Sequence, residues 1–339
     1  MLRALALARH GCGHVAPNPP VGAVIVCNGR IIGEGFHRQY GKLHAEANAL
    51  AAVKEPELLP HSTLYVTLEP CSHYGKTPPC AELIVSKKIK RVVVGCQDPF
   101  AEVAGKGIAR LREAGIEVET GCLEAECKVL IRPFTVYHTQ RRPYLLLKWA
   151  QSADGFIDRK RASLADGLPA KLSHPWVGFR IHQLRSQADA ILVGTQTALL
   201  DDPALTVRLW SGKNPLRVAI DRKGKIPEKA KLKDGEAETL IFTEQAQAPR
   251  KGVEYIPIDF SINIIPQILA VLYNRNIQTL LVEGGAQLLN SFLERGLWDE
   301  IRVEHSAIRI GGGVQAPVVH RKPDESEVVG TSIVDYYYQ

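Results

Sequence analysis

Apolar and polar positions at the start of the chain alternate in a way that predicts one helix and then a hairpin. Apolar residues at helical spacing favour a helix over Leu2–Arg9. The apolar run Val21–Val26 and the segment Arg30–Phe36 flank Asn28-Gly29, the dipeptide most typical of a two-residue hairpin turn. We therefore expect an antiparallel strand pair directly after the first helix.

The same alternation continues through the first 140 residues. Strands are expected over residues 62–68, 91–96 and 116–121, and helices over residues 44–54, from Pro79 onward and over 106–115, with a further amphipathic stretch over 124–139. Strands that alternate with helices in this way predict an α/β layer in which helices cover both faces of one sheet.

A second α/β region is expected after residue 141. At 339 residues the chain is long for a single core, and Arg141, Arg142 and Pro143 interrupt the pattern. We therefore expect domains at 1–141 and 142–339. In the second domain strands are expected over 143–150, 188–194, 216–221, 239–243, 279–285 and 299–306, and helices over 176–186, 266–275 and 286–294.

Composition limits the classes of protein to consider. Hydrophobic residues make up 45% and charged residues 23%, and no apolar run approaches the roughly 20 residues of a membrane span. Arg3 and Arg9 interrupt the first helix, so it does not match a secretory signal. We expect a cytoplasmic protein without membrane contact. The odd number of cysteines, seven, argues against a disulfide framework.

The net charge of +6 is concentrated in the first half of the chain. Lys and Arg outnumber Asp and Glu by 18 to 13 in residues 1–142, but only by 24 to 23 afterwards. Nucleic-acid binding usually requires a basic stripe interleaved with aromatic residues, whereas the tight basic cluster here is Lys87–Arg91 alone. We expect no nucleic-acid partner, and a phosphorylated small substrate explains the excess equally well.

Four residues in the first half carry the strongest chemical signal. Zinc prefers imidazole and thiolate ligands, and His44, Cys71 and Cys80 offer three of them with a fourth position left for water. Zinc deaminases combine H-x-E with P-C-x-x-C, and their glutamate acts as general acid and base. Here Glu46 completes H-x-E, but eight residues separate the cysteines, so the loop must return. The alternative is a buried cysteine pair beside an ordinary histidine.

The second half contains no G-x-G-x-x-G after a strand, so a Rossmann site is not expected. Its clearest local signal is the turn Gly284-Gly285 between a strand and a helix, whose N-terminal amides could receive a phosphate. Such turns often have purely structural causes, so this turn alone is a weak indication of a phosphate site. The segments 152–155 (SADG) and 200–208 (LDDPALTVR) make the functional interpretation of this half more specific.

Several stretches resemble one family of bifunctional enzymes. "PNPPVGAVIV", "HAEANAL", "EPCSHYGKTPPC" and "VAGKG" resemble the deaminase half of the riboflavin-biosynthesis diaminohydroxyphosphoribosylaminopyrimidine deaminase/reductases, and "SADG", "LDDPALTVR" and "TLLVEGGAQLLNSFL" resemble the reductase half. The resemblance implies an α/β fold, with a cytidine-deaminase-like three-layer domain followed by a dihydrofolate-reductase-like domain. It also implies zinc-dependent hydrolytic deamination of 2,5-diamino-6-(5-phosphoribosylamino)pyrimidin-4-one, followed by reduction of the ribose with NADPH.

The same resemblance assigns roles to individual residues. Glu46 would carry the proton in deamination, with zinc on His44, Cys71 and Cys80. Substrate contacts would come from Asn18, His37 and Lys76 in the first half and from Arg185, Leu205, Arg208 and Glu283 in the second. NADPH contacts would come from Ala150, Thr197, Asp201, Gly285, Ala286, Gln287, Leu288, Leu289, Asn290 and Ser291.

The chain departs from the family pattern at three places. Phe100 replaces a usual Asn, Arg222 replaces a small polar residue, and residues 167–176 differ from the usual run, which leaves cofactor contacts from Pro169 or Lys171 in doubt. Two alternatives remain open: a zinc deaminase or binding protein of nucleic acids, and an enzyme in which only the deaminase half works. We also expect a homo-oligomer, dimer or tetramer.

Overall fold

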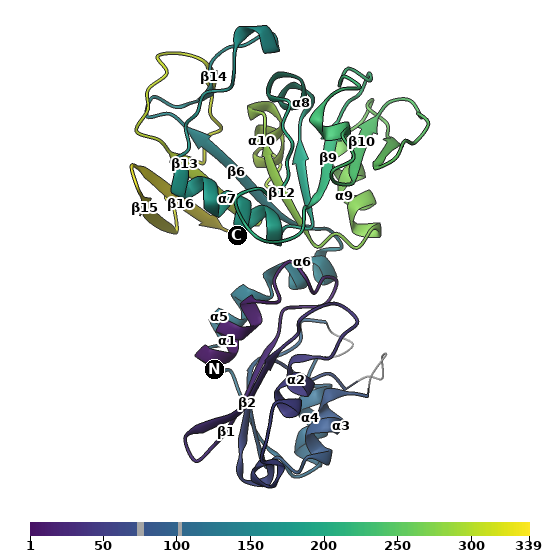
Figure 1. Cartoon of the computed structure of the whole chain (residues 1–339), viewed down its shortest axis with the longest axis vertical. Helices are drawn as coiled ribbons and strands as arrows, with labels where there is room; N and C mark the ends of the chain where they lie inside the picture. Colours follow the sequence, from purple (N-terminus) through teal and green to yellow (C-terminus); the bar gives the residue numbers. More distant parts are fainter. Residues whose placement is uncertain (73–77, 101–103) are drawn as a thin grey trace. The chain divides into compact units, whose positions relative to one another are not determined.

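The chain folds into two compact units. A computed structural model describes residues 1–72, 78–100 and 104–339, and the chain divides between Met1–Arg142 and Pro143–Gln339 (Figure 1). The boundary expected from the sequence, between residues 141 and 142, lies one residue before this division. Each unit has its own sheet and its own hydrophobic core.

Unit 1 contains a five-stranded sheet with the order β2-β1-β3-β4-β5. Its strands are β1 (Gly22–Cys27), β2 (Arg30–Phe36), β3 (Thr63–Leu68), β4 (Arg91–Cys96) and β5 (Glu117–Thr120). β1 is antiparallel to β2 and β3, whereas β3, β4 and β5 are parallel. Asn28 and Gly29 have φ values of 49° and 76°, the backbone that a hairpin turn of this kind needs, so the predicted hairpin is confirmed.

Helices cover both faces of this sheet, which gives the three layers expected (Figure 1). One face packs against α2 (Ala45–Ala51), α3 (Cys80–Ser86) and α4 (Lys106–Glu113), and the other against α1 (Leu2–Arg9), α5 (Glu124–Leu130) and α6 (Arg132–Gln140). Side chains alternate between the faces because strands have a period of two: Ala23 and Ile25 face α2, while Val24 faces α1. The stretch 124–139 forms two helices because the chain breaks at Ile131, before Pro133.

Unit 2 contains a nine-stranded sheet with the order β11-β10-β9-β8-β12-β6-β13-β16-β15. Its strands are β6 (Tyr144–Gln151), β8 (Ala190–Val193), β9 (Leu216–Ile220), β10 (Thr239–Thr243), β11 (Val253–Pro257), β12 (Thr279–Gly284), β13 (Glu300–His305), β15 (Glu325–Val329) and β16 (Ser332–Tyr338). The order from β11 to β13 is parallel, and β16 and β15 add antiparallel strands at one edge. β7 (Phe156–Asp158) and β14 (Val314–Gln315) form a separate ribbon.

Helices also cover both faces of the second sheet. α9 (Ile264–Asn274) and α10 (Ala286–Leu293) pack their apolar faces on the main core, while α7 (Pro175–Gln187) packs on β15 and β16 from the other side. α8 (Thr195–Asp201) and the strands β7, β11, β14, β15 and β16 were not predicted; α8 is short, and β15 is mostly exposed. Every helix in the described part of the chain is too short or too polar to cross a lipid bilayer.

Candidate functional sites

The first site lies where two helices of unit 1 begin. His44 directly precedes α2, Cys71 follows β3, and Cys80 opens α3. The Nδ1 atom of His44 lies 3.6 Å from the Cys71 sulfur and 3.4 Å from the Cys80 sulfur, and all three ligand atoms lie within 4.8 Å of one another. A tetrahedral zinc ion requires a separation of about 3.6 Å between nitrogen and sulfur ligands. The three donors therefore fit zinc in type and in spacing.

The two sulfurs of this triad are not equivalent. A hydrogen bond from the Cys80 thiol lowers the pKa of Cys71 to about 4, and His44 acts in the same direction. The same hydrogen bond, together with burial, raises the pKa of Cys80. The protein alone therefore favours the thiolate of Cys71 over that of Cys80, and a divalent cation would favour the second thiolate by its charge. All seven cysteines are free thiols in the structure, Cys71 and Cys80 included.

Glu46 lies in the first turn of α2, two residues after the metal-site histidine. Its side chain is buried, and burial, with a smaller contribution from Cys71, raises its pKa to about 7. A carboxyl group that titrates near neutral pH can both accept and return a proton. The arrangement therefore suits Glu46 to general acid and base chemistry.

Two expected substrate residues lie beside the triad. The amide of Asn18 contacts Nε2 of His37 at 3.1 Å, while Nδ1 of His37 contacts the Leu43 carbonyl at 3.0 Å. A carbonyl oxygen accepts only, so Nδ1 donates and Nε2 accepts from Asn18. Burial lowers the pKa of His37, which keeps it neutral, and its ring meets the His44 ring edge-on at 5.3 Å.

The remaining expectations in unit 1 have different outcomes. Lys76, the expected phosphate contact, lies outside the described residues. Phe100, which stands where the family pattern has a polar residue, packs its ring against His138 at 5.5 Å. Position 100 therefore makes an aromatic contact in this chain and has no polar side chain to offer a substrate.

Glu69, which the sequence patterns did not single out, joins the backbone directly before Cys71 to the backbone of residues 98 and 105–108. It is buried directly before Pro70 and Cys71, and its two oxygens accept four backbone N–H groups. Oε2 accepts from Asp98 at 3.2 Å and Gly105 at 2.9 Å, and Oε1 accepts from Gly107 at 2.8 Å and Ile108 at 3.2 Å. An acidic residue at the end of an apolar strand was the only sequence signal for this role.

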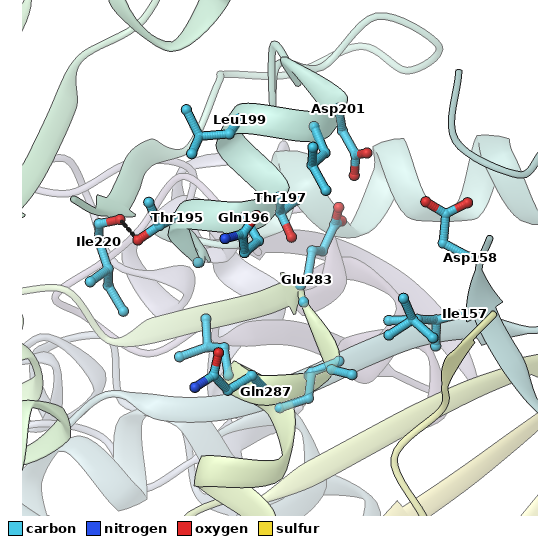
Figure 2. A pocket seen from close by; sticks show the side chains of 18 of the residues that line it. Ile157, Asp158, Thr195, Gln196, Thr197, Leu199, Asp201, Ile220, Glu283 and Gln287 are labelled. Atoms are coloured by element: carbon cyan, nitrogen blue, oxygen red, sulfur yellow. Dashed lines mark hydrogen bonds between the residues drawn. The ribbon is translucent and has the colours of Figure 1, made fainter. Parts of the chain in front are cut away.

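The second site is a cavity of about 880 Å³ in unit 2, at the carboxyl ends of β6, β8, β9 and β12 (Figure 2). Ligands of open α/β sheets bind at this edge. The expected cofactor residues that line it are Ala150, Thr197, Asp201, Gly285, Ala286, Gln287, Leu288, Leu289 and Ser291, and Glu283 lines it as well. Asn290 is not among the lining residues.

Arg185 and Glu283, both expected to contact substrate, form a buried ion pair. Nη2 of Arg185 donates to Glu283 at 2.6 Å and Nε at 3.1 Å, in a bidentate arrangement. Burial alone would raise the pKa of Glu283, but the charge and hydrogen bonds of Arg185 lower it. Lys148 lies in the same cavity, where burial lowers its pKa. The sequence analysis missed Lys148, although a lone lysine within the apolar run of β6 was a signal for it.

Arg208 lies at the surface next to this pair. Its backbone N–H donates to Nδ1 of the buried His182 at 3.0 Å, and its guanidinium donates to Thr206 at 3.2 Å. Arg185 also donates to the Thr206 carbonyl, at 3.4 Å, so both arginines converge on one residue. Leu205 is buried with a φ of 53°, which turns the chain at this point. Arg185, Leu205 and Arg208 are not among the lining residues.

The departures in unit 2 lie in the cavity wall. Pro169 lines the cavity, whereas Lys171 is exposed and is not among the lining residues. Arg222 lines it too, and its guanidinium forms an ion pair with Glu244 at 2.8 Å and lies 5.5 Å from the centre of the Phe260 ring. The unusual segment thus takes part in forming the cavity.

Comparison with known proteins matches each of the two units to a known family. The family described as "Cytidine and deoxycytidylate deaminase zinc-binding region" matches residues 1–96, and "RibD C-terminal domain" matches residues 143–333. "Riboflavin biosynthesis protein RibD" of Aquifex aeolicus is 42% identical over 316 residues, which cover 89% of this chain and 85% of that protein. The Escherichia coli protein of the same name is 35% identical, with 89% and 85% coverage.

Solved structures give the same result for the fold. A deaminase/reductase from Thermotoga maritima superposes with a TM-score of 0.89 at 39% identity, over 99% of this chain and 96% of that one. RibD of Acinetobacter baumannii superposes with a TM-score of 0.85 at 32% identity, over 99% and 97%. The expected fold, a cytidine-deaminase-like domain followed by a dihydrofolate-reductase-like domain, is confirmed, as is the expected need for zinc and NADPH. The chain belongs to the RibD family and is a bifunctional enzyme with a zinc-dependent deaminase domain and a reductase domain.

Proposed function

We propose that this chain catalyses two successive steps of riboflavin biosynthesis. Residues 1–141 would hydrolytically deaminate 2,5-diamino-6-(5-phosphoribosylamino)pyrimidin-4-one, and residues 142–339 would reduce the ribose of the product with NADPH. The observation that carries the proposal is the zinc-type triad beside the buried Glu46, in one chain with a cavity at the carboxyl edge of the second sheet. The name of the Thermotoga maritima relative, which gives both activities, supports the same pair of reactions.

In the deaminase site, His44, Cys71 and Cys80 would hold zinc, which supplies Lewis-acid activation of water. Glu46, with a pKa of about 7, would accept a proton from the attacking water and deliver it to the departing ammonia. Asn18 and His37 would orient the pyrimidine, because their polar groups lie beside the triad in one fixed tautomer. Lys76 would contact the ribose phosphate as a point charge.

In the reductase site, the cavity would hold NADPH, which supplies the hydride for C1' of the ribose. Contacts would come from Ala150, Thr197, Asp201 and the segment 285–291. The pair of Arg185 and Glu283 would bind the substrate next to the cofactor, and Lys148 adds an amine there whose pKa is lowered by burial. Hydride transfer then depends mainly on how these groups position the two reactants.

The two arginines and Leu205 would form the phosphate side of this site. Arg208 is exposed, so its guanidinium can meet a phosphate from solvent, and Arg185 is held 3.4 Å from the carbonyl of Thr206 beside it. Arginine suits a phosphate because its planar fork donates two parallel hydrogen bonds. The positive φ of Leu205 places Thr206 between the two.

We place the enzyme in the cytoplasm as a homo-oligomer, dimer or tetramer. Seven free cysteines suit a reducing compartment. Val328 on the edge strand β15 and Trp176 on α7 are exposed apolar side chains on which a second copy can pack. Light scattering of the purified protein measures the oligomeric state directly.

The experiment that tests the function follows both reactions at once. The purified enzyme receives the diaminopyrimidine phosphate with NADPH, and ammonia release and NADPH oxidation are recorded together. We expect ammonia first and NADPH oxidation after it. Ammonia release without NADPH oxidation would support an enzyme with only one working half, and binding of tRNA or single-stranded DNA at physiological salt would support the nucleic-acid alternative.

A further inference from the structure

A single buried side chain, Arg161, organises the segment that leads from β7 to α7. The side chain is only 4% exposed. Its Nε and Nη2 donate to Asp158 at 2.7 and 2.5 Å, and Nη2 also donates to Asp201. Nη1 donates to the carbonyls of Leu200, at 2.5 Å, and Gly167, at 3.4 Å. All five N–H groups of the guanidinium therefore have an acceptor within the protein.

These contacts fasten the segment to the cavity. Asp158 accepts the Ala170 N–H on its other oxygen, at 2.8 Å, so Arg161 and Asp158 together close residues 159–170 into a loop. Pro169, Ala170 and Leu172 then line the cavity. The segment that departs most from the family pattern is thus an ordered wall.

The same contacts also set the charge at one end of the cavity. The carboxylates of Asp158 and Asp201 both line it, and Figure 2 shows them at the same end, away from Thr195 and Ile220. The cofactor of this domain is a polyanion, and like charges repel strongly where water is excluded. Two bare carboxylates would therefore oppose its entry. Arg161 lies between them and, within the described part of the chain, supplies the one positive charge in hydrogen-bond contact with both.

We propose that Arg161 is a positioning residue of the reductase site, which cancels one of the two negative charges of Asp158 and Asp201 and fixes the cavity wall so that the polyanionic cofactor can bind. Its side chain lines the cavity too, but its N–H groups all have acceptors within the protein, so we expect it to act through the two carboxylates. The inference rests on the proposed reductase function.

The test compares a neutral with a charged replacement of Arg161 in the full-length enzyme. Reduction of the deaminated substrate is measured against NADPH concentration. Arg161→Gln, which keeps polarity but loses the charge, should raise the KM for NADPH at least tenfold and change kcat less than threefold. Arg161→Lys, which keeps the charge but loses the fork, should stay within about threefold of the wild-type KM. The matched control is Arg159→Ala, an exposed arginine of the same segment, with a KM within twofold of wild type.

A second substitution separates charge from structure. Asp158→Asn in the Arg161→Gln background removes one unpaired carboxylate, so the KM should return to within about threefold of wild type. Tryptophan fluorescence checks that each variant is folded, and the double variant decides the matter if Arg161→Gln alone does not fold. The proposal is overturned if Arg161→Gln has an unchanged KM for NADPH or a loss confined to kcat. It is also overturned if Arg161→Lys has an equal defect, or if the folded double variant has a KM raised tenfold. Wild-type enzyme that oxidises no NADPH would instead refute the proposed function.

Discussion

Glu69 offers the most direct test of how the deaminase site is held together. In Glu69→Gln an NH2 group replaces one carboxylate oxygen, and each oxygen accepts two backbone N–H groups. Whichever way the amide turns, two buried donors lose their acceptor and face another donor. An unsatisfied buried donor costs about 1–3 kcal/mol, so the substitution should lower the free energy of unfolding of unit 1 by about 2–6 kcal/mol.

The position of the tryptophans makes this measurable in the intact chain. All four, at 149, 176, 210 and 298, lie in unit 2, so urea unfolding followed by tryptophan fluorescence reports on unit 2. Zinc release to a coloured chelator during the same titration reports on unit 1. We expect the zinc-release midpoint to fall in Glu69→Gln while the fluorescence midpoint stays where it is.

Glu82→Gln is the matched control, because Glu82 lies on α3 and pairs with Arg110 of α4 at the surface. Exposed pairs contribute about 0–1 kcal/mol, so zinc release should move little in this variant. The reasoning about Glu69 is refuted if its variant loses less than about 1 kcal/mol, or if both transitions shift equally.

The remaining predictions concern the metal, the proton, the phosphate and pH. Purified enzyme should carry about one zinc per chain, and metal analysis of Cys80→Ser should find most of it lost; full retention would remove Cys80 from the ligand set. Glu46→Gln should keep its zinc and lose ammonia release, yet still oxidise NADPH with deaminated substrate; undiminished deamination would contradict its role. Arg208→Ala should weaken binding of the reductase substrate by about 1–3 kcal/mol, seen in KM, and leave ammonia release intact; an unchanged KM would exclude the phosphate contact. Burial and nearby arginines lower the pKa of His182 to about 4, so as pH falls from about 6.5 to 4 the unfolded chain binds a proton before the folded chain does. Up to about 3 kcal/mol of the free energy of unfolding is lost over that pH window. In His182→Asn, the free energy of unfolding measured at pH 6.5 and at pH 4 should lack this loss, and a loss equal to that of wild type would contradict the prediction.

Local patterns were sufficient for much of the fold. The hairpin at Asn28-Gly29 follows from its turn residues, and α1 begins and ends where the apolar spacing predicts. Helix α2 is shorter than the expected 44–54, and β15 was not predicted because most of its side chains are exposed. Elements that do not bury an apolar face leave little trace in the hydrophobic pattern.

The functional residues also differ in whether the sequence could predict them. The zinc-type triad could be anticipated because ligand chemistry restricts its residue types to His and Cys. Glu69, Lys148 and Arg161 could not, since a buried charge has meaning only through partners distant in sequence. Arg161 shows the difference, because its contact with Asp201 joins residues 40 positions apart.

The division of the chain at Arg142 has a consequence for the history of the gene. Within the described residues, the triad and Glu46 come from positions 44–80, and the cavity is lined by positions 148–314, so each active site is encoded by one uninterrupted stretch. A recombination event near codon 142 would transfer one of these two sets of residues whole and leave the other in place. Fusion, fission or exchange of partner domains at this point would therefore leave each of these two sets of residues undivided.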